Sequence, residues 1–459
     1  MWNPKTIDMD KPLYIAIVDA LERDINSGVL KPGQQMPPHR ELADIIGVNV
    51  STITRAYKEA ERRGLVSGTV GRGTFISVDV NTATSMMRPE TNNIGKLEMG
   101  LVLPLYEVEP DIEDKILHLV QSGHIAEYLR YTDPLGLPEH REIGALWTNR
   151  FGVPASADDI VVCSGAQHSM ACCLASLFQA GDKIAVDSLT YPGIKSLSAM
   201  LGIRLVPVDM DGEGMIPEAL EMVCRRDRIR GLYIMPGVQN PTTVSMSEGR
   251  RGKIAEVVLR HGLILIEDDA YSYTRPALPV PVACLVPQNS VYIAGVSKAF
   301  YAGLRVAFVV APKHLRNRIA KAVLNTIWMT PALNAAIVSE CIKDGTADKI
   351  MVAKKEEAAR RFAVVRDKLA GYAFAGPAEG FFIWLNIPDR WSGKEFELMA
   401  RESGVNIFCA EKFAVGSTTA PHAVRISLTG PSNIGELSRG IDVIKSLLDG
   451  EFVELDPML

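Results

Sequence analysis

The sequence lacks a strong charge of either sign. Its 459 residues include 49 Lys and Arg against 54 Asp and Glu, a formal net charge of −5. No basic field therefore covers the whole chain, and any nucleic-acid binding must come from a local patch. Hydrophobic residues make up 47% of the chain, which excludes a disordered protein, and the 37 Gly show no triplet period, which excludes collagen. The length suggests about three domains.

Cysteine is also scarce, with seven residues and no C-x-x-C pair. An odd count without paired spacing does not suit a secreted disulfide framework, so we expect reduced and mostly buried thiols. The first twelve residues lack the charged-then-apolar layout of a signal peptide. The most apolar stretch, residues 291–311, contains Lys298 and Arg305 and is no membrane span. These absences predict a soluble, cytoplasmic protein.

The first eighty residues form a pattern of their own. Leu13, Ile17, Leu21 and Ile25 recur every four residues, which predicts one apolar face of a helix over 13–25. A second short helix is expected after Pro38 and ends at Gly47, and a third begins with Ser51 as its N-cap. Residues 65–78 suit two short strands around a Gly-rich tip. Three short helices followed by a hairpin predict a winged helix-turn-helix.

Local charge favours DNA as the partner of this unit. Residues 51–74 hold five basic and two acidic side chains, a net +3 inside an acidic chain. Positive charge on a helix that fits the major groove is typical of duplex binding. From the pattern alone, a solvated helix face in an accessory domain is the alternative.

Residues 11–77 resemble the GntR family, because the cap, turn and wing signals of PLYIAIVDALERDINSGVLKPGQQMPPHRELADIIGVNVSTITRAYKEAERRGLVSGTVGRGTFIS follow in that family's order. The resemblance implies that Arg40 and Arg55 reach DNA from the two helices of the motif. It also implies that Arg72 and Gly73 approach the minor groove from the wing. An Arg fork suits this task because it makes paired hydrogen bonds to phosphate or guanine. The remaining residues that we assign to DNA binding are Ser51, Thr52, Thr54 and Lys58.

Beyond a polar linker at residues 79–95, short apolar runs alternate with helical stretches. This alternation predicts an α/β unit with a mostly parallel sheet buried on both faces. Ligands bind such sheets at the carboxyl ends of the strands. The expected strands are Ile160–Cys163, Lys183–Val186, Leu205–Val208, Leu232–Met235, Leu263–Ile266, Val291–Ala294 and Val306–Val310.

Five of these strands are followed by informative polar residues. Taken singly, each has an ordinary explanation: a glycine turn, a turn aromatic, or a surface charge. A metal at Asp268 and Asp269 is conceivable, but the eight His show no ligand spacing beside these acids, so we predict no metal site. Together the side chains match the needs of pyridoxal 5′-phosphate: a lysine for its aldehyde, a carboxylate for its ring nitrogen, and an anion-binding turn. They are Ser164, Gly165, Ala166, Tyr191, Asn240, Asp268, Tyr271, Ser297, Lys298 and Arg305.

Residues 97–450 resemble the fold-type I aminotransferases, through D-x-A-Y at Asp268, then S-K with Ser297 29 residues later, then G-L-R. The resemblance implies that Lys298 forms the Schiff base and that Asp268 pairs with the pyridine nitrogen. It places Tyr271 and Asn240 at the ring hydroxyl and Tyr191 on the ring face. It gives the phosphate to Ser164, Gly165, Ala166, Ser297 and Arg305, with Tyr131 added from the partner subunit, and a substrate or effector α-carboxylate to Arg425. One departure is Gly295, where the family often has Ser, so one phosphate hydrogen bond is in doubt.

The combination resembles the MocR-type regulators, a GntR-like unit fused to an aminotransferase-like domain. We expect residues 1–78 to bind DNA and residues 96–459 to bind the cofactor, with residues from about 313 onward as a smaller α+β part. The resemblance implies a homodimer whose DNA binding responds to the cofactor, or to an amine or amino acid, through Lys298. A working aminotransferase with an accessory domain stays open as the alternative.

Overall fold

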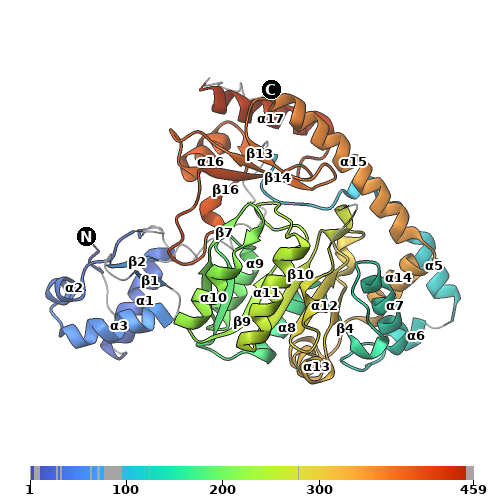
Figure 1. Cartoon of the computed structure of the whole chain (residues 1–459), viewed down its shortest axis with the longest axis horizontal. Coiled ribbons are helices and arrows are strands. Elements are labelled where there is room, and N and C mark those ends of the chain that lie inside the picture. The colour runs from blue at the N-terminus through green and yellow to red at the C-terminus, as the bar shows by residue number, and fades with distance from the viewer. Residues whose placement is uncertain are drawn as a thin grey trace.

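The computed structural model describes residues 2–4, 11–26, 29–30, 34–62, 65–69, 73–76, 96–123, 125–275, 277 and 279–450. The N-terminal part is the predicted winged helix-turn-helix (Figure 1). Its elements are α1 (Leu13–Asn26), α2 (His39–Ile46), α3 (Val50–Arg62), β1 (Val66–Thr69) and β2 (Gly73–Ile76). The strands β1 and β2 pair antiparallel, as a wing requires. Residues 70–72 and 77–95, which include Arg72 and the predicted linker, lie outside the described residues.

The apolar stripes of these helices meet in one cluster that includes Ile17, Leu42, Ile53 and Tyr57. Gly47 ends α2 with φ +74°, the left-handed conformation expected of a C-terminal glycine. The predicted cap of α3 is wrong. The helix begins at Val50, so Ser51 lies in its first turn, and its N–H donates to Asn49 Oδ1 at 3.3 Å. Asn is as good a cap as Ser, so Asn49 can take this place at the start of α3.

A seven-stranded sheet forms the centre of the larger part (Figure 1). The strand order is β4-β12-β11-β10-β9-β5-β6, and β12 alone runs antiparallel to its neighbours. Each of the seven predicted strands overlaps one observed strand, which confirms the mostly parallel sheet. The strands are β4 (Ile160–Cys163), β5 (Lys183–Asp187), β6 (Arg204–Val208), β9 (Ile229–Ile234), β10 (Ile264–Asp269), β11 (Ser290–Gly295) and β12 (Ala307–Val310).

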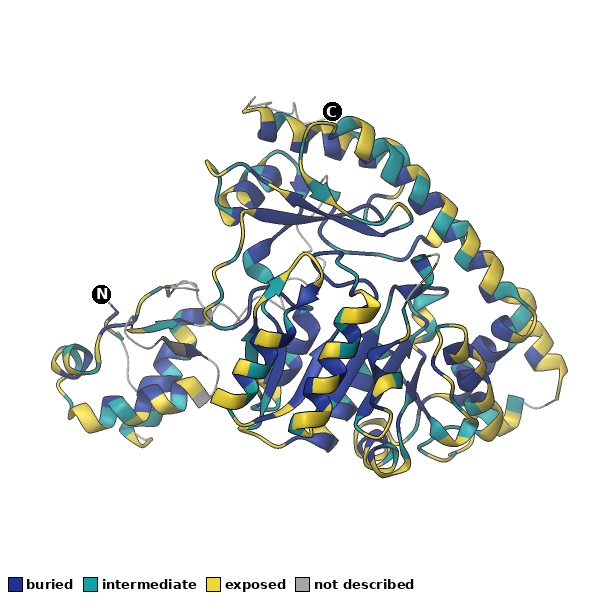
Figure 2. Cartoon of the chain, viewed as in Figure 1, coloured by how far each residue is buried: buried dark blue, intermediate teal, exposed yellow. Residues whose placement is uncertain are grey.

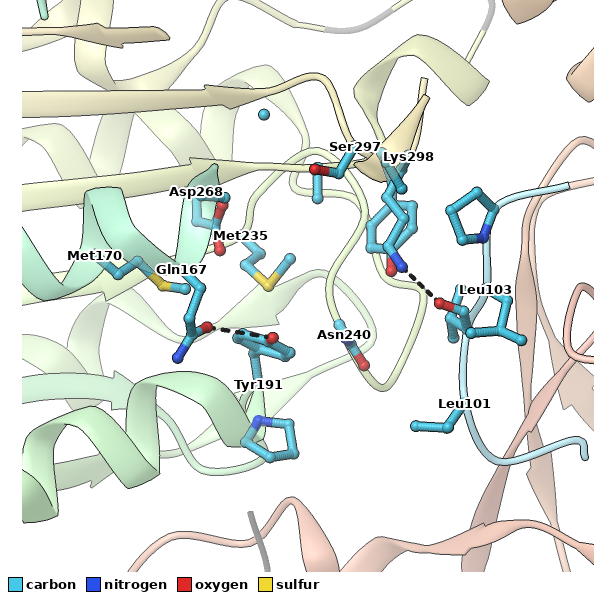
Figure 3. A pocket seen from close by; sticks show the side chains of 18 of the residues that line it. Leu101, Leu103, Gln167, Met170, Tyr191, Met235, Asn240, Asp268, Ser297 and Lys298 are labelled. Atoms are coloured by element: carbon cyan, nitrogen blue, oxygen red, sulfur yellow. Dashed lines mark hydrogen bonds between the residues drawn. The ribbon is translucent and has the colours of Figure 1, made fainter. Parts of the chain in front are cut away.

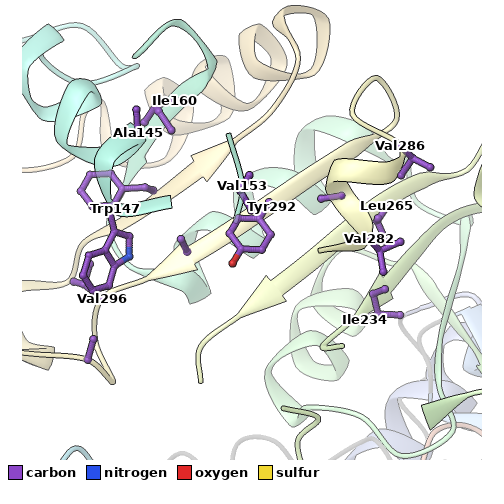
Figure 4. Packing of buried hydrophobic residues seen from close by; sticks show 14 of the residues in the cluster. Ala145, Trp147, Val153, Ile160, Ile234, Leu265, Val282, Val286, Tyr292 and Val296 are labelled. Atoms are coloured by element: carbon purple, nitrogen blue, oxygen red, sulfur yellow. The ribbon is translucent and has the colours of Figure 1, made fainter. Parts of the chain in front are cut away.

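Both faces of this sheet are buried, as Figure 2 shows. Alternate residues of one strand enter different cores: Leu265 and Tyr292 pack in one cluster (Figure 4), and Ile266 and Ile293 in the other. The first face is covered by α7 (Pro138–Asn149), α10 (Pro217–Arg226), α11 (Glu248–His261), α12 (Val282–Leu285) and α14 (Ala332–Lys343). The second face is covered by α8 (Ala166–Leu177), α9 (Pro192–Met200) and α13 (Lys313–Ile327). Nearby lie the shorter η1 (Tyr106–Val108), α5 (Glu113–Gln121), α6 (Ile125–Tyr128), β7 (Met210–Asp211) and β8 (Gly214–Met215).

A smaller antiparallel sheet lies above the carboxyl edge of the large one (Figure 1). It contains β13 (Phe374–Ala375), β14 (Phe382–Asn386), β17 (Ala423–Ser427) and β16 (Phe408–Cys409), and its helices are α15 (Thr346–Lys368), α16 (Gly393–Glu402) and α17 (Ile434–Asp449). The predicted domain boundaries stay predictions. The helix α13, which begins at Lys313, packs on α8 and the large sheet.

Residues 97–99 belong to the domain built around the smaller sheet, here called the small domain. β3 (Leu97–Glu98) pairs in parallel with β15 (Val405–Asn406), and Met99 is fully buried in the small domain's core. The chain then crosses to the large sheet through residues 100–110. All seven cysteines are free thiols, five of them buried. No helix in the described ranges is long and apolar enough to cross a membrane.

Candidate functional site

A cavity of about 540 Å³ lies at the carboxyl edge of the large sheet (Figure 3). The sheet brings together there most of the side chains predicted from the strand ends, although the role of each stays a prediction. Nine predicted residues line the cavity: Ala166, Tyr191, Asn240, Asp268, Tyr271, Ser297, Lys298, Arg305 and Arg425.

Lys298 follows β11 and points into this cavity. Its Nζ donates a hydrogen bond to the carbonyl oxygen of Val102 at 2.5 Å. Burial, together with the positive charges of Arg425, Lys354 and Arg305, lowers the pKa of Lys298 to about 7. A large fraction of this amine is therefore uncharged at neutral pH, which is the form that attacks a carbonyl carbon.

Asp268 lies at the end of β10, opposite Ile293 of β11. Its Oδ2 accepts a hydrogen bond from the Tyr233 hydroxyl at 2.8 Å, whereas its buried Oδ1 has no partner in the described structure. Burial raises the pKa of Asp268 to about 7. A buried carboxyl oxygen without a partner suits a ligand N–H, and a protonated ring nitrogen would also favour the ionised acid.

The turn between β4 and α8 approaches Arg305 closely. Gly165 has φ +84°, and a Cβ at this position would lie 2.4 Å from Arg305 Nη2. The guanidinium also donates through Nη1 to Ser297 Oγ at 2.8 Å. An arginine, a hydroxyl and the first N–H groups of a twelve-residue helix form an anion-binding corner.

Two details of this corner modify the prediction. Ser164 does not line the cavity, and its backbone N–H donates to His168 Nδ1 at 3.2 Å. A Cβ at Gly295 would lie 3.3 Å from the Cβ of Ala166, so the start of α8 crowds any side chain there. This crowding is a physical reason for the glycine in place of the family's serine.

Arg425 reaches the cavity from β17 of the small domain. Its guanidinium lies 4.9–5.6 Å from the ring centres of Phe382, Phe408 and Phe413. Nη1 donates to Asn240 Oδ1 at 2.7 Å, while Nε is buried without a partner in the described structure. The predicted effector arginine and the predicted ring-hydroxyl amide are thus in direct contact.

Sequence reasoning missed several residues of this site. Tyr233 lies inside β9, where the sequence indicates only a buried aromatic, and Gln167 follows the predicted turn and accepts from the Tyr191 hydroxyl at 3.4 Å. Residues 101–104 also line the cavity, and the backbone carbonyl of Val102 carries no signal in the sequence. Tyr131 does not line this cavity; its side chain is 83% exposed beside Trp328.

On the helix-turn-helix, the predicted DNA-binding residues differ in exposure. Arg40, Ser51, Arg55, Lys58 and Gly73 are exposed. The Arg55 guanidinium lies over the Tyr14 ring at 4.5 Å, which orients it while leaving its edge open. Thr52 is half-buried, as is Thr54, whose hydroxyl bonds to Val50 O and His39 Nδ1.

The fold and the cavity define the class. A mostly parallel sheet that presents a lysine to an anion-binding pocket at its carboxyl edge is the fold-type I arrangement of pyridoxal-phosphate proteins. The family model for aminotransferase classes I and II matches residues 104–441, and that for bacterial regulatory proteins of the gntR family matches residues 13–76. The chain belongs to the helix-turn-helix transcriptional regulators of the MocR type, which join these two domains.

Several known proteins are similar to this chain over most of its length. The uncharacterized HTH-type transcriptional regulator YdeF of Bacillus subtilis (strain 168) is 35% identical over 449 residues, 98% of this chain and 97% of that protein. The vitamin B6 salvage pathway transcriptional repressor PtsJ of Salmonella typhimurium is 26% identical over 90% of this chain and 93% of its own. An archaeal alanine:glyoxylate aminotransferase has the same fold, with TM-score 0.73 and 20% identity over 86% of this chain and 100% of its own.

The residues present fit the cofactor of this family, pyridoxal 5′-phosphate. The unpartnered Asp268 oxygen matches a ring N–H, and the Arg305 guanidinium, which lies against Gly165 at the start of α8, matches a phosphate. The lysine amine with a pKa of about 7 matches an aldehyde.

Proposed function

We propose that this regulator senses pyridoxal 5′-phosphate, with or without an amine or amino acid effector, in the cavity around Lys298, and that the bound state sets its affinity for DNA. One observation carries the proposal: a chain with a GntR-type DNA-binding unit also holds a cavity lined by nine of the residues predicted to bind the cofactor or the effector. The relative PtsJ, a repressor of vitamin B6 salvage by its name, supports the cofactor as a signal.

Each part of the cavity has a task in this proposal. Arg305, Ser297 and the start of α8, with Gly165 and Ala166, hold the phosphate. Asp268, oriented by Tyr233, holds the proton on the ring nitrogen, and Tyr191 covers the ring. When bound, the cofactor supplies an aldehyde that combines reversibly with a primary amine, either that of Lys298 or that of an incoming effector.

Arg425 gives the effector site its chemistry. Its guanidinium is buried among three phenylalanine rings, so a carboxylate that reaches it gains a strong paired hydrogen bond. Asn240 Oδ1 accepts a hydrogen bond from Arg425 Nη1 in this structure. A carboxylate that binds Arg425 would take over this donor, and Asn240 would then be released to bind the ligand. An α-amino acid fits better than a simple amine, since it alone offers both groups.

We further propose a homodimer in the cytoplasm, where chromosomal DNA lies. Tyr131 would reach the partner's phosphate corner, in keeping with its exposure on its own chain. Trp328 beside it and the exposed Leu129 would be covered in the same interface. Two DNA-binding units held at a fixed distance would then read paired half-sites with higher affinity.

A ligand changes DNA binding only through different affinities for two arrangements of the molecule. The cavity is suited to this because its walls come from both domains: Lys298 from the large sheet and Arg425 from β17. A carboxylate on Arg425 and an amine near Lys298 would draw the two domains together.

The test begins with genomic fragments selected by the purified protein with and without pyridoxal phosphate. Gel shifts on a recovered fragment then compare wild type with Lys298→Ala, each with cofactor and with a panel of amino acids. We expect wild type to change its affinity for the fragment and Lys298→Ala to lose both that response and borohydride-trapped cofactor. Equal DNA affinity in every state would contradict sensing, and rapid turnover of an amino acid and keto acid pair would favour an aminotransferase.

A further inference from the structure

A buried ion pair lies next to the backbone of Lys298 and does not line the cavity. Lys354 of α15 and Glu109, which follows η1, meet with Nζ and Oε1 2.6 Å apart, and their side chains are 0% and 8% exposed. Burying two charges is costly unless their hydrogen bonds are satisfied. Glu109 Oε1 also accepts the backbone N–H of Tyr301 at 2.8 Å. The pair therefore joins the long helix, the 105–110 segment and the loop after β11.

The same lysine reaches the backbone of Lys298. Lys354 Nζ donates to the Lys298 carbonyl oxygen at 3.3 Å, and the Tyr273 hydroxyl donates to that oxygen at 2.6 Å. Two side chains from different elements thus hold one carbonyl group. Because the carbonyl and the side chain share one Cα, this grip fixes the origin and the direction of the Lys298 side chain.

We propose that Lys354, Glu109 and Tyr273, here called the Lys298 clamp, are positioning residues that fix Lys298 for covalent attachment of the cofactor. This inference rests on the proposed function, in which Lys298 combines with the cofactor's aldehyde. A side chain that must meet a small target gains from a fixed backbone, because less conformational freedom is lost on binding.

The clamp also bears on the charge state of Lys298. The cations that face its amine are Arg425 from β17, Arg305 from the loop after β11, and Lys354 from α15. Arg425 and Arg305 line the cavity itself, where ligand groups reach them. Lys354 is paired with Glu109, and Glu107 adds a second negative charge near it. Removing the Lys354 charge is expected to raise the pKa of Lys298, so that cofactor uptake needs a higher pH.

The first test uses Tyr273→Phe, which deletes one hydroxyl. Its control is Tyr301→Phe, whose hydroxyl donates to the Pro110 carbonyl at 2.7 Å and does not touch Lys298. Titration of the full-length protein with pyridoxal phosphate, followed by visible absorbance, is expected to show about fivefold weaker binding in Tyr273→Phe. The control is expected to stay within twofold of wild type.

The second test removes both charges together, in Lys354→Met with Glu109→Gln, so that no buried charge is left alone. Its control is Lys355→Met, the next residue on α15, which faces Glu379 at 3.8 Å. The rate of cofactor uptake is measured against pH. Asp268 also titrates near pH 7, so the measurement compares the midpoint of each variant with that of wild type. Because the charge of Lys354, and not that of Glu109, is among the causes that lower the pKa of Lys298, we expect the midpoint to rise in the double variant only.

The outcomes separate the two proposals. A wild-type protein that loads normally, with both clamp variants matching it in affinity and midpoint, overturns the clamp alone. A wild-type protein that takes up no cofactor overturns the proposed function and the clamp with it.

Discussion

Asp187, Glu267 and Asp268 are carboxyl groups that the sheet buries close to the cavity, and burial raises the pKa of each to about 7. Glu267 is satisfied in part, since it accepts the N–H of Ala283 at 2.7 Å. Asp187 and Asp268 each keep one buried oxygen without a partner in the described structure. The carboxyl edge of the sheet is therefore short of hydrogen-bond donors, and these acids resist ionisation until a donor or a cation arrives.

Asp187→Asn is expected to stabilise the protein at high pH. The pKa of Asp187 is about 7 in the folded chain against an ordinary 3.8, so the folded chain binds this proton more tightly than the unfolded chain. The free energy of unfolding of the wild type therefore falls as pH rises from about 4 to about 7, whereas Asn has no proton to lose. Urea unfolding should show a gain on the order of 4 kcal/mol for the variant at pH 8 relative to its difference from wild type at pH 4. A difference independent of pH would contradict the assignment.

At the scale of the elements, the anion-binding corner between β4 and α8, which we propose to hold the phosphate, depends on one residue, Gly165. Gly165→Ala should lower the affinity for pyridoxal phosphate by about tenfold or more, because the new Cβ would displace Arg305. Gly181→Ala is the matched control: its φ is +92°, but nothing lies within 4 Å of the added Cβ. Both glycines have a positive φ, so both variants should lose stability in thermal unfolding, but only Gly165→Ala should lose cofactor affinity.

The next prediction concerns α3, the second helix of the helix-turn-helix motif. Arg55→Ala should weaken binding to a selected DNA fragment by about 10- to 100-fold and reduce the salt dependence by about one counterion. Cofactor uptake should stay unchanged. Arg439→Ala, which removes an exposed arginine from α17, serves as control. Unaltered affinity in Arg55→Ala would show that another face of the domain meets the duplex.

The sequence predicted well which secondary-structure elements form and which residues lie at the ends of the strands. Lys298, Asp268 and Tyr191 belong to different strands, yet each follows an apolar run, and parallel strands place their carboxyl ends along one edge. Tyr233 was missed because its direction depends on register: it pairs with Ile266 of β10, and only that alignment puts its hydroxyl on Asp268. Lys354 was missed because a lysine within a charged helix is normally solvated, and only the path of residues 105–110 buries it.

At the scale of the whole molecule, the proposed homodimer, in which each site takes Tyr131 from the partner, predicts complementation in mixed dimers. A Lys298→Ala chain lacks the lysine of its own site, and a Tyr131→Phe chain would, by this proposal, weaken phosphate binding in its partner's site. In a dimer of one of each, one site is spoiled twice and the other has both residues. Co-expressed, differently tagged chains should therefore recover one high-affinity cofactor site per dimer, counted by visible absorbance. Mixed dimers that bind no better than Tyr131→Phe alone would place Tyr131 outside the partner's site.

The pairing of β3 with β15 decides where the chain from the DNA-binding unit is anchored. The first described residues after the linker are stitched by backbone hydrogen bonds to the small domain, through Leu97 N–H to Gly404 O and Met99 N–H to Asn406 O. Any rotation of the small domain toward the large sheet would move residues 97–99 with it, because these hydrogen bonds join them to β15. In the proposed function, a closure of the two domains around a small molecule would therefore move the point at which the chain from the DNA-binding unit enters the small domain.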